Sequence, residues 1–95
     1  MILHVTEAKY LYDYVIWLRF NDGAEGEIDL KDELEGEVFG PLKDLEKFKS
    51  FKVDSVLQTI AWDNGADLAP EFLHENMKVL AQQTLEGQKV EKSKS

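Results

Sequence analysis

Two alternating segments joined by a short polar loop constrain the fold of this chain more than any other feature. Residues 14–20 read YVIWLRF and residues 24–30 read AEGEIDL, and in both segments the side chains alternate with a period of two. This period is typical of a β-strand with one buried face. The two segments and the Asn-Asp-Gly sequence between them therefore predict an antiparallel hairpin.

The length of the loop decides how the two strands pair. A two-residue Asp22-Gly23 loop would put Phe20 opposite Glu25 and would mix apolar and charged side chains on both faces. A three-residue loop, in which the glycine closes a type I turn in the left-handed region, instead pairs Phe20 with Ala24. Because only this register separates an apolar face from a charged face, we predict the three-residue loop.

The predicted register defines an outer face of the hairpin, on which one large aromatic side chain lies among charges. Trp17 lies opposite Glu27 on this face, and Arg19 lies beside Glu25. An exposed tryptophan in such a place is typical of a hot spot for a protein partner. If a second helix covers this face, Trp17 belongs to the core instead, and the sequence leaves both interpretations open. The predicted partner surface consists of Val15, Trp17, Arg19, Glu25 and Glu27.

Further hydrophobic patterns and turn signals predict the remaining elements. They are a strand over residues 2–9, a turn over 11–13, a short helix over 42–48, a second hairpin from strands 51–56 and 57–62, and a longer helix over 69–83. The side chains predicted to face the core are Leu42, Leu45 and Phe48 in the short helix and Phe72, Leu73, Met77 and Leu80 in the longer one.

Together these elements predict an α+β fold in a single domain over residues 1–85, followed by a flexible polar tail over residues 86–95. The predicted architecture is a small antiparallel sheet built from two hairpins and an N-terminal strand, with one short and one longer helix.

Residues 59–73, TIAWDNGADLAPEFL, combine the end of a strand, a turn and the start of a helix. Gly65 suits the turn, Asp67 is the best local candidate to cap the helix, and Pro70 suits its first turn, where the missing N–H costs nothing. We expect Trp62 to pack against the start of this helix as a structural anchor, in preference to a contact with a ligand.

Length, charge and cysteine content limit the classes of function. The chain has 95 residues, 19 acidic against 11 basic side chains, a formal net charge of −8 and no cysteine. The negative charge disfavours nucleic-acid binding by this chain alone, because it repels phosphate backbones. The lack of cysteine excludes disulfides, thiolate zinc sites and cysteine nucleophiles, and fits a reducing cytoplasm. No apolar segment approaches the roughly 20 residues that span a bilayer, so we expect no membrane insertion.

Acidic side chains concentrate in residues 22–37, where eight of them accompany the single Lys31. A solvated face is the favoured interpretation, and a binding patch for a basic partner is the alternative.

Side chains with catalytic or metal-binding chemistry are sparse. His4 and His74 have no partner at a spacing typical of a metal site, and Asp63 to Asp67 lack the twelve-residue ligand pattern of a calcium loop. No serine lies in the sequence context of a known catalytic nucleophile. Our first interpretation is therefore a protein without enzymatic activity, cofactor or metal.

Five segments carry a resemblance to a known family. They are FNDG at 20–23, IDL at 28–30, VFGPLKD at 38–44, FKSFKVD at 48–54 and TIAWDNGADLAPEFL at 59–73. In this order they resemble the short bacterial proteins grouped as domain of unknown function 2442, over roughly residues 2–75. The most specific positions of the resemblance are Trp62, Gly65, Asp67, Pro70, Glu71 and Leu73.

The resemblance implies a small α+β fold with no established catalytic residues and no known cofactor. Some relatives carry a helix-turn-helix segment after this domain, and some are encoded beside small proteins of toxin–antitoxin type. Because this chain ends at Ser95, we expect no DNA-reading module in it.

Two hypotheses of function follow. The preferred one is a non-enzymatic protein-interaction module that binds a basic protein partner, as the neutralising component of a toxin–antitoxin-like gene pair. The alternative is a small-ligand- or metal-binding domain, in which Trp62 and the carboxylates from Asp63 to Glu71 form a pocket. The hairpin edges and Trp17 also offer surfaces through which a homodimer can form.

Overall fold

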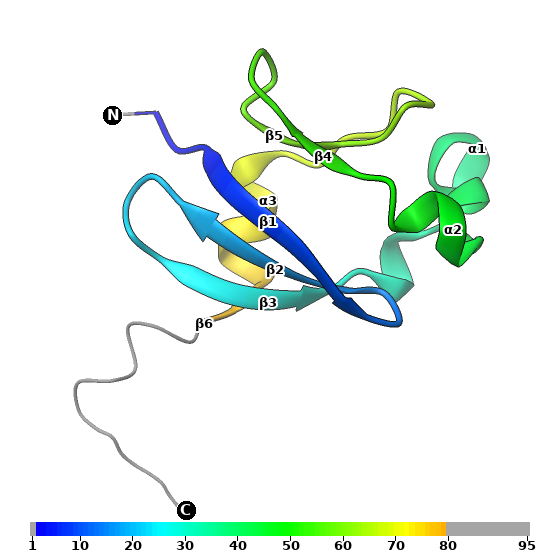
Figure 1. Ribbon diagram of the computed structural model, residues 1–95, viewed down its shortest axis with the longest axis horizontal. Helices are drawn as coiled ribbons and strands as arrows, with labels where there is room; N and C mark the ends of the chain where they lie inside the picture. The colour runs from blue at the N-terminus through cyan, green and yellow to red at the C-terminus, as the bar shows by residue number, and fades with distance from the viewer. Residues whose placement is uncertain (1, 80–95) are drawn as a thin grey trace, which may run out of the picture.

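A computed structural model describes residues 2–79 of the chain, and its strands form two antiparallel sheets. Strands β1 (Val5–Tyr12), β2 (Val15–Phe20), β3 (Glu25–Asp29) and β6 (Lys78–Val79) form one sheet in the order β1-β2-β3-β6. Strands β4 (Lys52–Asp54) and β5 (Thr59–Ala61) form a separate two-stranded sheet. Figure 1 shows this second sheet beside β1, the edge strand of the first. The predicted α+β class is confirmed.

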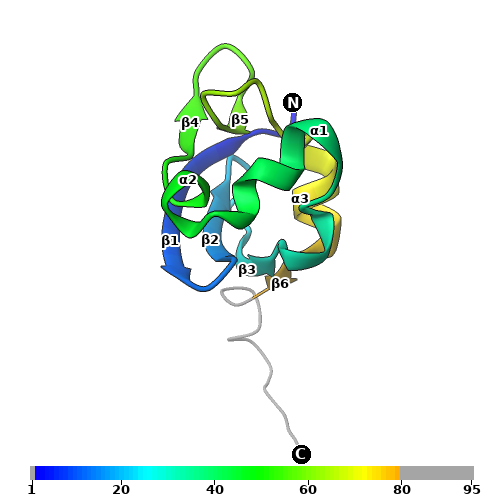
Figure 2. The same ribbon diagram turned by 90° about the vertical axis from the view of Figure 1, so that its right-hand side faces the viewer.

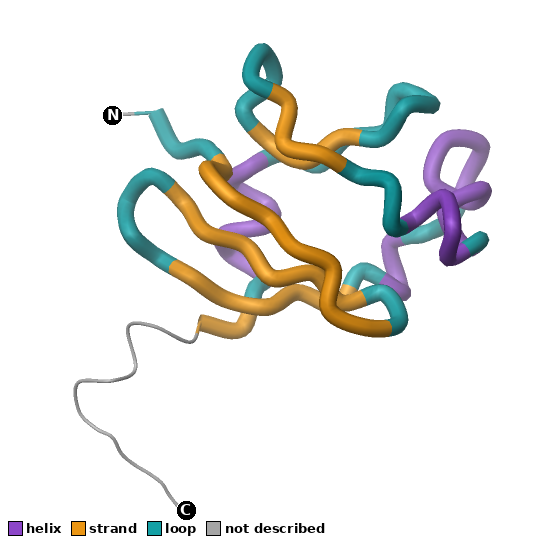
Figure 3. Tube along the Cα trace, in the orientation of Figure 1, coloured by secondary structure: helices purple, strands orange, loops and turns teal. Residues whose placement is uncertain are grey.

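The helices are all short and gather in two places. They are α1 (Gly36–Phe39), α2 (Leu45–Phe48), α3 (Pro70–Asn76) and two 3-10 turns over Lys31–Glu33 and Gly40–Lys43. Helix α3 lies behind the four-stranded sheet, whereas α1 and α2 lie together beyond one end of its strands (Figures 2 and 3). None of the helices among residues 2–79 has the length and apolar character needed to cross a bilayer.

The pairing of β2 with β3 confirms the predicted three-residue loop. Ile16 pairs with Ile28, and Leu18 pairs with Gly26. The N–H of Phe20 donates to the carbonyl of Ala24 at 2.9 Å, and Gly23 closes the loop with φ of +90°, in the left-handed region. The inner face of this hairpin is fully apolar and enters one hydrophobic core with α3, because Leu18 and Leu73 are both completely buried.

A second loop in the chain has the same hydrogen bonds as the first. The N–H of Trp62 donates to the carbonyl of Ala66 at 2.9 Å, and Gly65 closes this loop with φ of +93°. In the first loop Asp22 Oδ1 accepts the N–H of Ala24 at 2.9 Å, and in the second Asn64 Oδ1 accepts the N–H of Ala66 at 3.1 Å. The sequences NDGA and DNGA thus build one loop type twice, with acid and amide exchanged.

The first loop is also tied to helix α3 by a side-chain hydrogen bond that sequence reasoning missed. His74 Nε2 lies 2.9 Å from Asp22 Oδ2, and the His74 ring meets the Phe20 ring edge-on at 4.9 Å between centroids. The backbone N–H of Ala24, and after it the hydrogen bond and charge of His74, hold the pKa of Asp22 below its usual value against the effect of partial burial. His74 therefore fastens the helix to the hairpin.

The N-terminal strand is shifted along the chain from its predicted position. Residues 2–9 were expected to be extended, but β1 begins at Val5 and continues to Tyr12, and the turn follows at Asp13, whose φ is +46°. Before Val5 the chain is held by a side chain instead of a strand. Asn21 Nδ2 donates to the carbonyl of Ile2 at 2.8 Å, and Asn21 Oδ1 accepts the N–H of His4 at 2.9 Å.

The prediction of one continuous helix over residues 42–48 is wrong, because the helix is broken at Asp44. Asp44 has extended backbone angles and its carboxylate accepts the N–H of Glu46, so it ends a 3-10 turn and caps α2. Leu42 and Phe48 are buried as predicted, but Leu45 is 39% exposed. The break at Asp44 changes the helical phase, which turns Leu45 away from the core.

The predicted helix over residues 69–83 is too long. Pro70 occupies the first turn as expected, but α3 ends at Asn76, and Lys78–Val79 continue as strand β6 against β3. Gly26 permits this pairing, because a Cβ there would lie 2.5 Å from the carbonyl oxygen of Lys78. Leu80, the remainder of the predicted helix and the predicted polar tail lie outside the described residues.

Asp67 does not cap α3 as predicted. The N-cap position is Ala69, without a side-chain hydrogen bond, whereas Asp67 is exposed and forms an isolated bridge with Ala61. Asp67 is too far ahead of the helix start at Pro70, because a capping side chain reaches the N–H groups two or three residues after it.

Replacing Asp22 with asparagine tests the charge of Asp22 beside His74 separately from the loop hydrogen bond. Asn64 shows that asparagine accepts the equivalent backbone N–H in this loop type. Because the folded-state pKa of Asp22 is lowered, its charge stabilises the fold above the unfolded-state pKa of about 3.9, and this contribution is lost as the pH falls through the folded-state value. We expect Asp22→Asn to lower the free energy of unfolding by about 0.5–1 kcal/mol at pH 7, with solvent screening limiting the effect.

Urea unfolding of both proteins at neutral and acid pH measures this difference, which should shrink as the pH falls below the unfolded-state pKa of about 3.9 and through the lower folded-state value. Equal stability at pH 7, or a difference that persists in acid, would contradict a stabilising charge at this position.

Candidate functional site

The first candidate site is the outer face of β1, β2 and β3. Arg19 lies at its centre between two acids, with Nη2 at 2.7 Å from Glu25 Oε2 and Nη1 at 3.3 Å from Glu7 Oε1. A second row of side chains crosses all four strands of the sheet, because Lys9 pairs with Trp17, Trp17 with Glu27, and Glu27 with Lys78. In this row Trp17 therefore has a cation, Lys9, on one side. On its other side lie an anion, Glu27, and then a second cation, Lys78.

Trp17 is held in place by two cations. Lys9 Nζ lies 5.3 Å from the centre of the indole, and Arg19 Cζ lies 5.5 Å from it. The side chain is half-buried by these neighbours, and its N–H has no hydrogen-bond partner among residues 2–79. Figure 1 views this face, and no described helix crosses it. Of the two interpretations left open by the sequence, the covering helix is wrong for the described part of the chain.

The predicted surface includes one residue that a partner cannot reach. Val15 is only 7% exposed, because it lies on the central strand between Tyr12 on β1 and Asp29 on β3. The remaining four residues of the predicted partner surface do lie together on the outer face, in the predicted pairing of Trp17 with Glu27 and Arg19 with Glu25.

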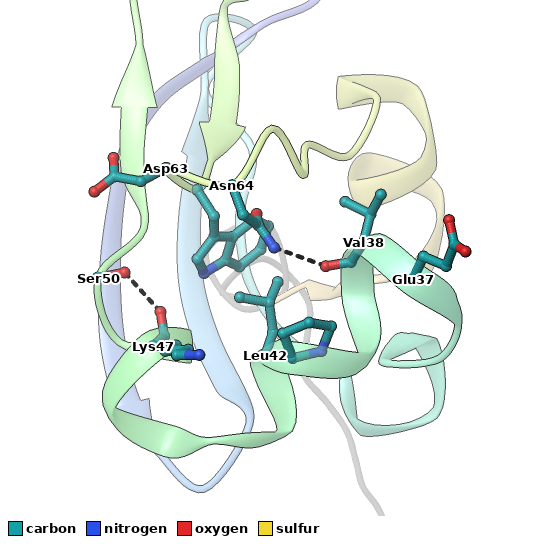
Figure 4. A pocket seen from close by; sticks show the side chains of 9 residues that line it. Glu37, Val38, Leu42, Lys47, Ser50, Asp63 and Asn64 are labelled. Atoms are coloured by element: carbon teal, nitrogen blue, oxygen red, sulfur yellow. Dashed lines mark hydrogen bonds between the residues drawn. The ribbon is translucent and has the colours of Figure 1, made fainter.

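The second candidate site is a pocket of about 510 Å³ between α1, α2 and the loop after β5. It is lined by Glu37, Val38, Pro41, Leu42, Lys47, Ser50, Trp62, Asp63 and Asn64. Figure 4 shows Leu42 at its base and Val38 on one side, with Asp63 and Glu37 directed away from each other at opposite margins. Its volume lies within the range of roughly 300–1,000 Å³ found for ligand pockets.

Trp62 is a buried anchor, as predicted, but with other aromatic partners than expected. It is 4% exposed, and its ring lies 5.9 Å from Phe48, 6.2 Å from Phe51 and 6.4 Å from Phe39. Its Nε1–H donates to the carbonyl of Phe48 at 2.9 Å in the core. Trp62 therefore ties β5 to α2, whereas sequence reasoning had assigned it to the start of α3.

Most polar groups of the pocket already have partners within the chain. Asn64 Nδ2 donates to the carbonyl of Val38 at 2.8 Å, while its Oδ1 is held by the loop (Figure 4). The Ser50 hydroxyl donates to the carbonyl of Lys47 at 2.6 Å, and Asp63 lies 3.6 Å from Lys52 Nζ. The groups that remain for a ligand are the apolar walls and the charged side chains of Glu37 and Lys47.

The six most specific positions of the family resemblance do not converge on one site. Only Trp62 among them lines the pocket; Gly65 serves its loop, Pro70 begins α3 and Leu73 is fully buried. Asp67 and Glu71 are exposed. No group of three or more side chains of metal-ligand type occurs within residues 2–79.

Sequence reasoning missed most of the pocket, because three separate segments build it. Val38 and Leu42 come from one segment, Lys47 and Ser50 from the next, and Asn64 from the loop after β5. The one available signal was the likeness of NDGA to DNGA. It predicts that Asn64 Oδ1 accepts a backbone N–H within its own loop, so that the Asn64 side-chain NH2 group is free to donate to a neighbouring segment.

Comparison with protein families confirms the resemblance found in the sequence. The model of the family described as protein of unknown function DUF2442 matches residues 5–78, and the chain belongs to this family. Searches of curated proteins and of solved structures give no match.

Replacing Asn64 with aspartate tests the connection between the loop and α1. The aspartate keeps the acceptor for the Ala66 N–H, as Asp22 does in the first loop, but it loses the donor to the Val38 carbonyl. We expect faster amide hydrogen exchange over residues 36–40 and a loss of about 0.5–1.5 kcal/mol in stability. Hydrogen exchange measured by mass spectrometry detects the change.

Asp63→Asn is the matched control, because Asp63 is exposed and lies only near Lys52. We expect it to change stability by less than about 0.5 kcal/mol and to leave exchange in α1 unaltered. Unaltered exchange in Asn64→Asp as well would show that the bond to Val38 does not hold α1.

Proposed function

We propose that this chain is a small, non-enzymatic protein-interaction module that binds its partner through the outer face around Trp17. The observation that carries the proposal is the half-buried indole whose N–H has no partner within residues 2–79, held between Lys9 and Arg19. A tryptophan fixed by its neighbours loses little conformational freedom on binding and can offer both apolar area and a hydrogen bond.

A basic protein is the partner that the charges favour. The chain has a formal net charge of −8, and Glu25 and Glu27 flank the tryptophan on β3. Such a field increases the rate at which a basic protein finds the surface. Lys9 and Arg19 then restrict which partners fit, because a cation placed directly on the indole would meet them.

The finer role that we propose is the neutralising component of a toxin–antitoxin-like gene pair, acting in the cytoplasm. Small size, acidity and the lack of cysteine support it, together with the family resemblance. Neither candidate site gathers a nucleophile with a base, which supports a role without catalysis.

A small-ligand domain at the Trp62 pocket is the second candidate function. The pocket volume of about 510 Å³ favours it, whereas the internal hydrogen bonds of Asn64 and Ser50 leave mainly Glu37 and Lys47 to recognise a polar ligand. Thermal shift with metabolites and divalent cations tests this candidate, since saturating ligand at 100 times its Kd stabilises by about 2.7 kcal/mol.

Trp17→Ala separates binding from folding. We expect the variant to keep its fold, because Trp17 lies outside the core cluster, and to bind the basic product of the adjacent gene at least about 30-fold more weakly. Titration calorimetry with the purified partner measures the affinity. Co-expression measures neutralisation, which the variant should lose.

Leu45→Ala is the control, because it also shortens a partly exposed apolar side chain but lies on α2. It should bind and neutralise like wild type. A harmless adjacent gene product, together with no stoichiometric protein partner in pull-downs from the native host, would overturn the proposed function.

A further inference from the structure

The turn between β4 and β5 presents two adjacent apolar side chains to solvent. Val56 is 87% exposed and Leu57 is 48% exposed, and Val56 is the most exposed large apolar residue of the described chain. Neither residue belongs to the surface around Trp17 or to the Trp62 pocket. Exposure of this kind at a projecting turn has no role in the stability of the monomer.

The turn is fixed in this shape by its own hydrogen bonds. Asp54 Oδ1 accepts the N–H groups of Val56 at 2.8 Å and Leu57 at 3.0 Å. Gln58 adopts a left-handed φ of +61°, which is costly for a residue other than glycine, and its carbonyl accepts the N–H of Val5 at 3.0 Å. The turn is thus a rigid projection, and docking it would cost little conformational entropy.

The Trp62 pocket of the same chain has the chemistry to receive this turn. Its walls include Pro41, Leu42 and Val38, which is 43% exposed, and its Asn64 and Ser50 side chains are already hydrogen-bonded within the chain. Because these two polar side chains are satisfied and the walls between them are apolar, the pocket can accept an apolar side chain beside its charged residues Glu37, Lys47 and Asp63. The turn brings no charge of its own to them, because no charged residue occurs between Asp54 and Asp63.

A single molecule cannot make this contact. Val56 and Leu57 precede β5, whereas Trp62 and Asn64 follow it, so the turn and the pocket lie at opposite ends of one hairpin (Figure 1). The three residues of β5 alone separate them by about 10 Å. If this turn fills the pocket, it therefore fills the pocket of a second copy.

A two-fold axis that passes through the hairpin lets both contacts form at once. It places the turn of each copy at the pocket end of the other copy's hairpin. Among the described strands β4 is hydrogen-bonded only to β5, so its other edge is available for pairing. If two β4 strands pair antiparallel with Val53 on the axis, Lys52 faces Asp54 of the other copy, and Val56 comes opposite Ser50, which lines the pocket.

We propose that two copies of this chain form a two-fold dimer through β4, in which Val56 and Leu57 of each copy enter the Trp62 pocket of the other. The dimer is independent of the proposed function, because it uses neither Trp17 nor Arg19.

Analytical ultracentrifugation of three variants tests the proposal. Wild type should sediment at twice the mass of the chain. Two variants should sediment as monomers: the turn variant Val56→Asp/Leu57→Asp and the pocket variant Val38→Asp. In a dimer of either variant, both turn-to-pocket contacts are lost. Ile2→Asp is the control, since Ile2 is 75% exposed elsewhere on the chain, and it should remain a dimer.

A mixture of the turn variant and the pocket variant gives the sharpest result. The pocket variant still has an intact turn, and the turn variant still has an intact pocket. A mixed dimer therefore keeps one of the two turn-to-pocket contacts. The mixture should therefore associate more strongly than either variant alone. A monomeric wild type, a dimeric turn variant, open-ended assemblies or a mixture no stronger than its components would overturn the proposal. Circular dichroism verifies that each variant is folded.

Discussion

The hydrogen bond from Trp62 Nε1 to the carbonyl of Phe48 is the interaction on which the rest of this structure depends. It is 2.9 Å long, lies in the core, and joins β5 to the end of α2. The ring of Phe48 also meets the ring of Tyr14, next to the four-stranded sheet, at 5.2 Å, so a continuous aromatic contact connects the two sheets. This connection acts together with the bond from the Val5 N–H to the Gln58 carbonyl to hold the small β4–β5 sheet, which alone would be marginal in water. The position of the pocket and the direction of the projecting turn both follow from it.

The two tryptophans of the chain occupy opposite physical situations. Trp62 has its N–H bonded and three aromatic rings around it, which is how a large aromatic side chain stabilises a small domain. Trp17 lies on the other side of the sheet, with cations over its ring and no partner for its N–H within residues 2–79. In the sequence the two residues look alike, because Trp17 lies on a strand and Trp62 directly follows one. Only the tertiary structure shows that Trp62 supports the fold and that Trp17 is available to a partner.

The parts of the fold that follow local rules could be predicted from the sequence. The alternation around Trp17, the loop ending at Gly23 and the helix start at Pro70 are set by side-chain period, left-handed backbone and a missing N–H, and all three are as predicted. The parts that failed depend on distant contacts. Met77 ends α3 because the next residues pair with β3, and Leu45 turns outward because Asp44 caps a new helix. The outer face was predicted with its correct pairing, except that neighbouring strands bury Val15. The pocket could not be predicted, since no local pattern brings its three segments together.

The claim that Trp62 supports the fold while Trp17 serves a partner is tested most directly by the stabilities of Trp62→Phe and Trp17→Phe, measured by urea unfolding with circular dichroism. Trp62→Phe leaves the buried carbonyl of Phe48 without its donor and creates a cavity, so the free energy of unfolding should fall by about 2–4 kcal/mol. Trp17→Phe keeps an aromatic ring on the outer face and should change this free energy by less than about 0.5 kcal/mol. Similar losses in the two variants, or a larger loss in Trp17→Phe, would contradict the account.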